Sequence, residues 1–488
     1  AARARSRADW LVGMNFSRAY TLSRGALSSV GRVQTPTLAM VVARDEAIRS
    51  FKPQPFLEVE ATFTGANGSY KGTYYRPPSE GLRDDKGQLR AFKLQQARLP
   101  ADGQMAQAIA DRVRAGSARV LAVECQPKRT LSPMFYDLTE LQRHANQLYG
   151  YTAQQTLDAA QALYERHKAL TYPRTDSRHL SSSVAQTLAG VVRAIAPNYA
   201  GCIADGSGVL PLGNRFVNDA EVSDHHALIP TAVRPSLAPD SAEARVYDLV
   251  CRRLLMAWHT ELVEGVTRVL TEVSAVGASA HSAPDLFATS GTSVEKPGWT
   301  VLEQRARAKP DASTAPKIPG GLVASAPQRV AAVAVHRRQT QPPKPHTEAT
   351  LLTAMETAGK EVSDRELSAA MRDAGLGTPA TRAATIEKLL AHGYLSRKGK
   401  VLIATADGVA LIRAVHPLVR SAEMTGAWEL RLRRIERGEE AVDGFMRELA
   451  TYVQEVVAEE AKKPVLQAPR SAAPRQAKVR AAGTRRSR

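Results

Sequence analysis

Hydrophobic positions recur at helical spacing within the first fifty residues and then change to alternation. The segment TPTLAMVVARDEAIRSF, residues 35–51, places Leu38, Val41 and Val42 on one side of a helix, and residues 8–50 are expected to be helical. From residue 56 the sequence FLEVEATFTG alternates apolar and polar side chains, and GSYKGTYYRP follows a turn that contains glycine. This pattern predicts two strands joined by that turn.

Helix-start signals appear again in residues 137–168. Asp137 with Glu140, and Thr152 with Gln155, have the spacing of a capping box, in which each side chain can bond the other's backbone. Two helices are therefore predicted to begin at these positions.

The second half of the chain returns to strands and then to short helices. Residues 265–340 are rich in Val, Ala, Ser, Thr, Gly and Pro and are expected to return to the sheet that begins near residue 56. The proline-rich RRQTQPPKP, residues 337–345, marks a boundary because proline interrupts both helix and sheet.

Residues 347–415 show a compact pattern of three predicted helices and a hairpin. Ser363 is a plausible cap of the second helix, and Thr378 with Pro379 fits the start of the third. YLSRKGKVLIAT then gives two short strands around a basic turn. This outline is typical of a winged helix-turn-helix, which usually contacts nucleic acid, although some such modules bind only proteins.

Length and charge narrow the class of protein. A chain of 488 residues divides into two to four domains, and no apolar run reaches the length of a membrane span, about 18 residues. Nine Lys/Arg and no acid lie in residues 461–488, which supply half of the net charge of +18. We expect a disordered basic tail that attracts phosphates, with a merely solubilising tail as the alternative.

The candidate chemistry centres on ALTYPRTDSRHL, residues 169–180. Pro173 disfavours helix at Tyr172 and places it in an extended segment, where Arg174, two residues on, points to the same side. A phenol with a pKa near 10 attacks a phosphodiester only with assistance, and a cation at the phosphate oxygens supplies it. Taken alone, a tyrosine before proline is more often structural.

A second segment, VSDHHALIPT at residues 222–231, contains His225 and His226, either of which could donate to a phosphate. No third ligand stands at metal spacing, and the three scattered cysteines form neither a disulfide framework nor a zinc motif, so no zinc is expected. The sequence has no GxxxxGK[ST] motif, and no ATP is expected.

These segments together resemble a type IA DNA topoisomerase, most closely the bacterial topoisomerase III branch. The blocks that carry the resemblance run in family order through residues 8–455: ADWLVGMNFSRAYT, SVGRVQTPTLAMVVARDEAI, YDLTELQRHANQLYGYTAQQTLDAAQALYE, LTYPRTDSRHL, VSDHHALIPT, HTEATLLTAMETAGKE, GLGTPATRAATIEKLLAHGYLSRKGK and MTGAWELRLRRIERGE.

The resemblance implies a mixed α and β multidomain fold: a toroid with a discontinuous β-rich arch, a helical tyrosine-bearing domain and a winged-helix-like base. The expected divisions are a helical base and groove segment (1–55), a first arch part (56–126), a helical gate domain (127–264), a second arch part (265–338), the winged-helix-like base (339–460) and the tail (461–488).

The resemblance also implies a reaction and its residues. The family cuts single-stranded DNA through a 5′-phosphotyrosine intermediate, passes a strand and religates without ATP. Tyr172 matches the nucleophile, Arg174 the arginine at the scissile phosphate and His225 the phosphate donor. The expected DNA-binding residues are Asp9, Arg18, Arg32, Gln34, Arg178, His226, Thr378, Thr381 and Arg382. Thr347 and Glu348 match motif positions with groove or packing roles.

Complete family members carry an N-terminal Toprim domain that holds Mg²⁺, and no Asp-x-Asp cluster occurs in this sequence. We therefore expect a fragment, which as an isolated chain is inactive without the Toprim domain and its Mg²⁺ site. The alternatives are a split enzyme whose Toprim half is encoded separately and a catalytically inactive paralogue that binds single-stranded DNA. A helix-turn-helix transcription regulator does not explain the long N-terminal portion.

The remaining expectations follow from the same resemblance. They are a monomer without membrane association, located in the cytoplasm at the nucleoid, with a RecQ-type helicase or a single-strand-binding protein as a possible partner.

Overall fold

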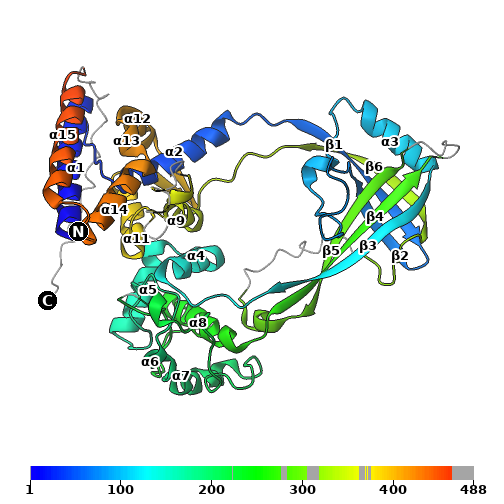
Figure 1. Ribbon diagram of the computed structural model, residues 1–488, viewed down its shortest axis with the longest axis horizontal. Helices are drawn as coiled ribbons and strands as arrows, with labels where there is room; N and C mark the ends of the chain where they lie inside the picture. The colour runs from blue at the N-terminus through cyan, green and yellow to red at the C-terminus, as the bar shows by residue number, and fades with distance from the viewer. Residues whose placement is uncertain are drawn as a thin grey trace, which may run out of the picture.

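The structure is a computed structural model that describes residues 2–463, except for residues 223, 276–282, 305–317, 362–365, 367, 368, 370 and 372–374. The helix predicted to begin at Ser363 and the tail 464–488 lie outside the described residues. The described elements form three groups arranged in a ring (Figure 1). We name them the barrel (55–130, 262–296 and 327–339), the helical unit (131–261 and 298–304) and the base (2–50 and 346–463).

Six antiparallel strands close the barrel in the order β1-β2-β5-β4-β3-β6. Their bounds are β1 Pro55–Gly65, β2 Gly68–Tyr74, β3 Ser117–Thr130, β4 Leu262–Ser274, β5 Asp285–Lys296 and β6 Pro327–Gln339. In β1 every second side chain from Leu57 to Phe63 is buried, which confirms the alternation predicted from residue 56. Helix α3, Gln104–Ala115, adds its apolar face to the barrel core.

The barrel consists of two well-paired sets of strands. One set, β6-β1-β2, continues into the base, and the other, β3-β4-β5, continues into the helical unit. Two residue pairs join β2 to β5, and two join β3 to β6. Each seam continues briefly past the strand ends, through the Tyr75 N–H that donates to Leu286 and the Val120 N–H that donates to Ala326. A shared core that includes Phe63 and Phe287 fills the space between the two sets.

The helical unit packs around its own hydrophobic core. Its elements are α4 Leu138–Tyr149, α5 Ala153–Glu165, α6 Ser182–Ala185, α7 Leu188–Ile195, η2 Ala196–Tyr199, η3 Asp219–Glu221, α8 Ala242–Leu255, η4 Met256–Trp258 and η5 Gly298–Leu302. Asp137 caps α4, and Thr152 with Gln155 forms the predicted capping box of α5. Leu302, at the end of η5, is fully buried in this core, so a segment expected to belong to the arch packs here instead.

The base joins the beginning of the described chain to its end. Its elements are α1 Ala2–Arg24, α2 Gln34–Ser50, α9 Glu348–Glu356, η6 Ala358–Glu361, α11 Pro379–Ala391, β7 Leu395–Lys398, β8 Val401–Ala404, α12 Ala406–Ala414, α13 Pro417–Arg420, α14 Ala422–Glu436 and α15 Val442–Ala461. Helices α1 and α15 lie side by side (Figure 1). The predicted third helix starts at Pro379 with Thr378 as its cap, and the predicted hairpin follows as β7 and β8.

Candidate active site

Tyr172 lies in the irregular segment after α5, and hydrogen bonds to residues 227–231 hold that segment in place. The backbone N–H of Thr171 donates to the carbonyl of Ile229 at 3.0 Å, and the Ile229 N–H donates to the hydroxyl of Thr171 at 3.0 Å. Pro173 is buried and forms a bend directly after the tyrosine. The two segments selected from the sequence are therefore neighbours in the fold.

His225 packs against the ring of Tyr172. The ring centroids lie 4.3 Å apart with the planes tilted by 42°. Tyr164, from α5, meets the same tyrosine edge-on at 5.5 Å. The Thr175 hydroxyl donates to the backbone carbonyl of His225 at 3.2 Å, which fixes the histidine relative to the tyrosine segment.

Arg174 is exposed, and within the described part of the chain it has no hydrogen-bond or ion-pair partner. Its guanidinium is available to an anionic ligand. No β-strand is assigned over residues 171–179, because these residues bond to several neighbours singly rather than to one partner in a ladder. The expectation that Tyr172 and Arg174 point to the same side of an extended segment stays a prediction.

Arg178 is directed toward α4. Its Nε lies 3.4 Å from Asp137 Oδ2, and its Nη2 lies 3.7 Å from Glu140 Oε2. The backbone N–H of Leu138 also donates to the carbonyl of Thr175 at 3.1 Å. These contacts tie the residues that follow Tyr172 to the first turn of α4.

Asp137 combines burial with a crowded charged environment. Burial raises the pKa of this carboxyl to about 6, although Arg178 and the N–H of Glu140 act in the opposite direction. The carboxylate accepts that N–H at 2.6 Å. A carboxyl whose pKa is raised to about 6 therefore lies beside the tyrosine segment.

A second candidate site is a pocket of about 290 Å³ in the base. It is lined by Arg5, Asp9, Arg32, Val33, Gly375, Gly377, Thr378, Thr381, Thr385 and Glu429. Four residues predicted to bind DNA meet here: Asp9, Arg32, Thr378 and Thr381. Within the described residues, Arg18 and Gln34 do not line it; Arg18 is exposed, and Gln34 is buried and donates to Ser29 Oγ at 2.9 Å.

Arg32 is held from two sides in this pocket. Its Nε donates to Asp9 Oδ1 and its Nη1 to Glu429 Oε1, both at 2.7 Å, and its guanidinium lies 5.5 Å from the Trp428 ring centroid. Burial acts to raise the pKa of Glu429, but Arg32 and Arg5 outweigh it and the net pKa is lowered. Arg32 is thus a buried, paired cation.

Other predicted residues connect the base to the helical unit. Arg382 is buried, and its Nη1 donates to Thr139 Oγ1 at 3.0 Å, while burial lowers its pKa. Glu348 accepts the backbone N–H of Ala153 at 2.6 Å. His226 Nδ1 lies 2.8 Å from the carbonyl oxygen of Ala227.

Sequence reasoning missed Arg5 and Glu429 as members of the pocket. Arg5 stands four residues before Asp9, one helical turn away, and this spacing could have indicated it. Glu429 meets Arg32 only through the tertiary fold, and nothing in its local sequence indicates the pairing.

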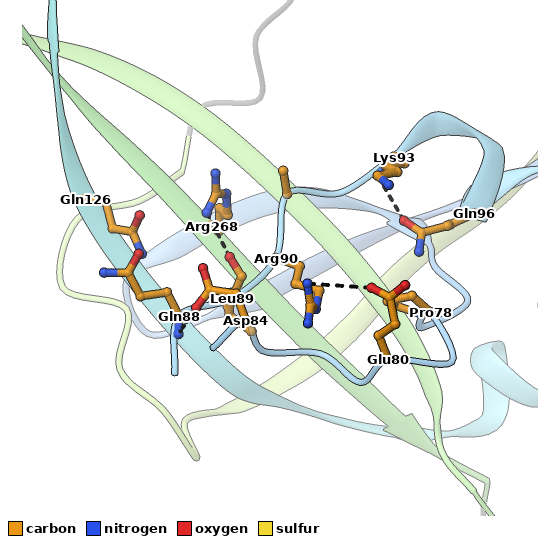
Figure 2. Close-up of a pocket in the computed structure, with 11 residues that line it drawn as sticks. Pro78, Glu80, Asp84, Gln88, Leu89, Arg90, Lys93, Gln96, Gln126 and Arg268 are labelled. Carbon is orange, nitrogen blue, oxygen red and sulfur yellow. Dashed lines mark hydrogen bonds and ion pairs between the residues drawn. The ribbon is translucent and has the colours of Figure 1, made fainter. Parts of the chain in front are cut away.

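A further pocket, of about 400 Å³, lies on the barrel beneath the loop that connects β2 to α3 (Figure 2). Arg268 donates to the carbonyl of Leu89 at 2.8 Å, and Arg90 pairs with Glu80 at 3.7 Å. None of the candidate residues selected from the sequence lines this pocket.

The described residues contain no group of three or more His, Cys, Asp or Glu side chains that could hold a metal ion. The acid nearest in sequence to Tyr172, Asp176, is exposed, and Asp137 is engaged by Arg178. These residues do not fit Mg²⁺. In the part of the chain that the structure describes, no helix is both long and apolar enough to cross a membrane.

Comparison with known proteins places this arrangement in a family. A family model described as DNA topoisomerase matches residues 1–447, and the chain belongs to the type IA DNA topoisomerase family. It is 36% identical over 467 residues to DNA topoisomerase 3 of Shouchella clausii and 35% identical over 479 residues to that of Vibrio cholerae.

The alignments cover 94% and 95% of this chain, but 60% and 70% of the two relatives. The chain therefore spans about 60% of the length of the Shouchella protein. Full-length topoisomerase I from Thermotoga maritima has a similar fold, with a TM-score of 0.61 and 20% identity, covering 93% of this chain and 68% of that one.

Proposed function

We propose that this chain carries the nucleophile and the single-stranded DNA-binding part of a topoisomerase III-like enzyme. The observation that carries the proposal is the stacking of Tyr172 and His225, from separate segments, beside an exposed Arg174. The domain divisions expected from the sequence, with a gate between the arch and the base, belong to the same proposal. The ring of three groups in Figure 1 supports it.

In the proposed reaction the Tyr172 oxygen attacks the phosphorus of a single-stranded DNA phosphodiester. A P–O bond forms as the bond to the 3′-oxygen breaks; the phenol gives up its proton, and the leaving oxygen takes the electron pair and a proton, so the charge balances. Arg174 offsets the charge on the non-bridging oxygens, and His225 donates a hydrogen bond to the phosphate. Attack by the 3′-hydroxyl reverses the step and releases the tyrosine, so the cycle needs no ATP.

Asp9, Arg32, Thr378 and Thr381 would then hold the single strand at the pocket of the base. Arg32 acts there mainly by fixing Asp9 and Glu429, because it is already paired. We propose that Mg²⁺ acts on a domain outside this chain, since the described residues do not fit it.

A covalent adduct assay, run with Mg²⁺ and the amino-terminal portion of a relative, tests the proposal, because the isolated chain is expected to be inactive. Cleavage that leaves a 5′-phosphotyrosine transfers the label of a 3′-labelled oligonucleotide to the protein. We expect Tyr172→Phe to abolish labelling while binding of a single-stranded oligonucleotide is retained. The matched control, Tyr164→Phe, removes the hydroxyl of the neighbouring ring and should keep labelling.

Two outcomes are informative in opposite ways. Labelling that persists in Tyr172→Phe would show that the nucleophile is another residue. Binding without any labelling, in a preparation supplied with Mg²⁺ and the amino-terminal portion of a relative, would favour the alternative of an inactive DNA-binding paralogue.

A further inference from the structure

The turn between α4 and α5 presents two oppositely charged helix ends to the base. Helix α4 ends at Tyr149, Gly150 follows with φ of 75°, and α5 begins at Ala153. Aligned peptide dipoles make the C-terminus of α4 partly negative and the N-terminus of α5 partly positive. The two ends lie within one short turn.

The base places a charge of the fitting sign at each end. Lys400, in the β7–β8 hairpin, donates from Nζ to the carbonyl of Gln147 at 3.1 Å, in the last turn of α4. Glu348, the first residue of α9, accepts the N–H of Ala153 at 2.6 Å. Both contacts join the base to the helical unit.

The hairpin also holds the glutamate in position. Arg397 donates to Glu348 Oε1 from Nε at 3.0 Å and from Nη2 at 2.6 Å, and Nη2 also contacts Glu387 at 2.8 Å. Glu348 is only 2% exposed, and a buried carboxylate is stable only when it is paired. Arg397 therefore holds the Glu348 carboxylate where it can accept the Ala153 N–H at the N-terminus of α5.

The rest of this seam is polar. Asn146 accepts the N–H of Ala349 at 3.2 Å, and Arg143 pairs with Glu356. Among the described residues, Ala153 is the single member of the helical unit in the hydrophobic cluster of the base, and the cluster of the helical unit contains no residue of the base. Directional polar contacts can be exchanged for water, so parting this seam exposes little of either hydrophobic cluster beyond Ala153.

We propose that Glu348, Arg397 and Lys400 form a latch that holds the helical unit closed on the base. The latch rests on the proposed function in one respect: strand passage requires the ring to open. It gives the basic hairpin an intramolecular partner, in place of the nucleic-acid contact that a winged helix usually makes.

The distance between the helical unit and the base, measured without DNA, tests the latch. The full chain carries dyes at Ala189→Cys on α7 and Ala384→Cys on α11, both exposed positions, with Cys125→Ser and Cys202→Ser to prevent other labelling. Single-molecule energy transfer then gives the ratio of open to closed molecules. Because catalysis is not measured, failure of the proposed function leaves this readout intact.

Lys400→Met keeps the aliphatic stem and should raise the open-to-closed ratio about fivefold. Lys398→Met is the matched control, because it removes the same charge from an exposed position of the same hairpin and should leave the ratio unchanged. Glu348→Gln, which keeps the volume of the side chain, should raise the ratio about tenfold. Raising the salt concentration should increase the open-to-closed ratio more in the unmodified chain than in Lys400→Met, because salt screens the Lys400 contact that this variant already lacks.

Two results would overturn the latch. One is an identical distance distribution in Lys400→Met, Glu348→Gln and the unmodified chain. The other is an equal loss of affinity for a dT oligonucleotide in Lys400→Met and Lys398→Met without a change in distance, which would make the hairpin a DNA-binding wing. Circular dichroism melting of each variant identifies any that fails to fold, and in that case the remaining variant decides.

Discussion

Arg174, in the tyrosine site, and Arg32, in the pocket of the base, differ in exposure and in pairing. Arg174 is exposed on an irregular segment and unpaired within the described residues, whereas Arg32 is buried between Asp9 and Glu429. An exposed arginine has its donors free for a phosphate, and a buried one has already used them in the fold. The comparison separates a cation whose donors are free, as the proposed role of Arg174 requires, from one that builds the pocket.

Removing Arg32 should give the largest effect on stability. Arg32→Ala leaves the buried Glu429 without its main partner and should lower the free energy of unfolding by about 3–5 kcal/mol, measured by urea denaturation. Arg5 pairs with the same carboxylate at 2.6 Å but is 46% exposed, so Arg5→Ala should cost at most about 1 kcal/mol. If Arg32→Ala and the unmodified chain had the same free energy of unfolding, Arg32 would not be a structural residue, and its contrast with Arg174 would fail.

Removing Arg174 should affect the reaction instead. Arg174→Ala should lower covalent adduct formation by about 10²- to 10³-fold, because charge on the phosphate oxygens is no longer offset. Its free energy of unfolding should change by less than about 0.5 kcal/mol, as at other exposed positions. A variant that unfolds easily but still forms the adduct would contradict the proposed role.

Asp137 should give a smaller effect that depends on pH. Its folded pKa of about 6 exceeds that of an unfolded aspartate, about 3.9, so between these values the folded state binds more protons. Because of Asp137, the free energy of unfolding should therefore fall by about 2–3 kcal/mol as the pH rises from 4 to beyond 6. Asp137→Asn keeps a good N-cap and should remove this part of the slope.

Urea denaturation of both proteins at pH 4.5 and pH 7 measures the difference. Other titrating groups contribute equally to the two proteins, so the difference between their pH profiles isolates Asp137. Identical profiles would show that the carboxyl does not titrate near neutral pH.

Local patterns were sufficient for much of the fold. The alternation from residue 56 gave β1, and the spacing of Thr152 with Gln155 gave the start of α5, because both signals depend only on neighbouring residues. The expected return of residues 265–340 to the sheet that begins near residue 56 is confirmed, since β6 pairs with β1 and β5 with β2. The closure of that sheet into a barrel and the register of β1 on β6 could not be predicted, because they join residues more than 250 positions apart. The return of Leu302 to the helical core is a tertiary contact of the same kind.

The candidate site, too, was predictable where it depends on local sequence and not where it depends on distant elements. Pro173 correctly indicated a non-helical Tyr172, and the family motif identified His225, which the structure brings to the same ring. The pairing of Arg178 with Asp137 and of Glu348 with the N-terminus of α5 depends on elements far apart in the chain. The basic hairpin looked from its sequence like a nucleic-acid wing, yet two of its cations contact the protein itself.

The short pairings within the barrel have a mechanical consequence. One strand set is anchored in the base and the other in the helical unit, and the ladders that join the sets are much shorter than those within each set. A force that pulls the base away from the helical unit therefore acts mainly on the short β2–β5 and β3–β6 ladders. The longer ladders within each set resist the same force. We expect the barrel to deform elastically, by a small shear of one strand set relative to the other.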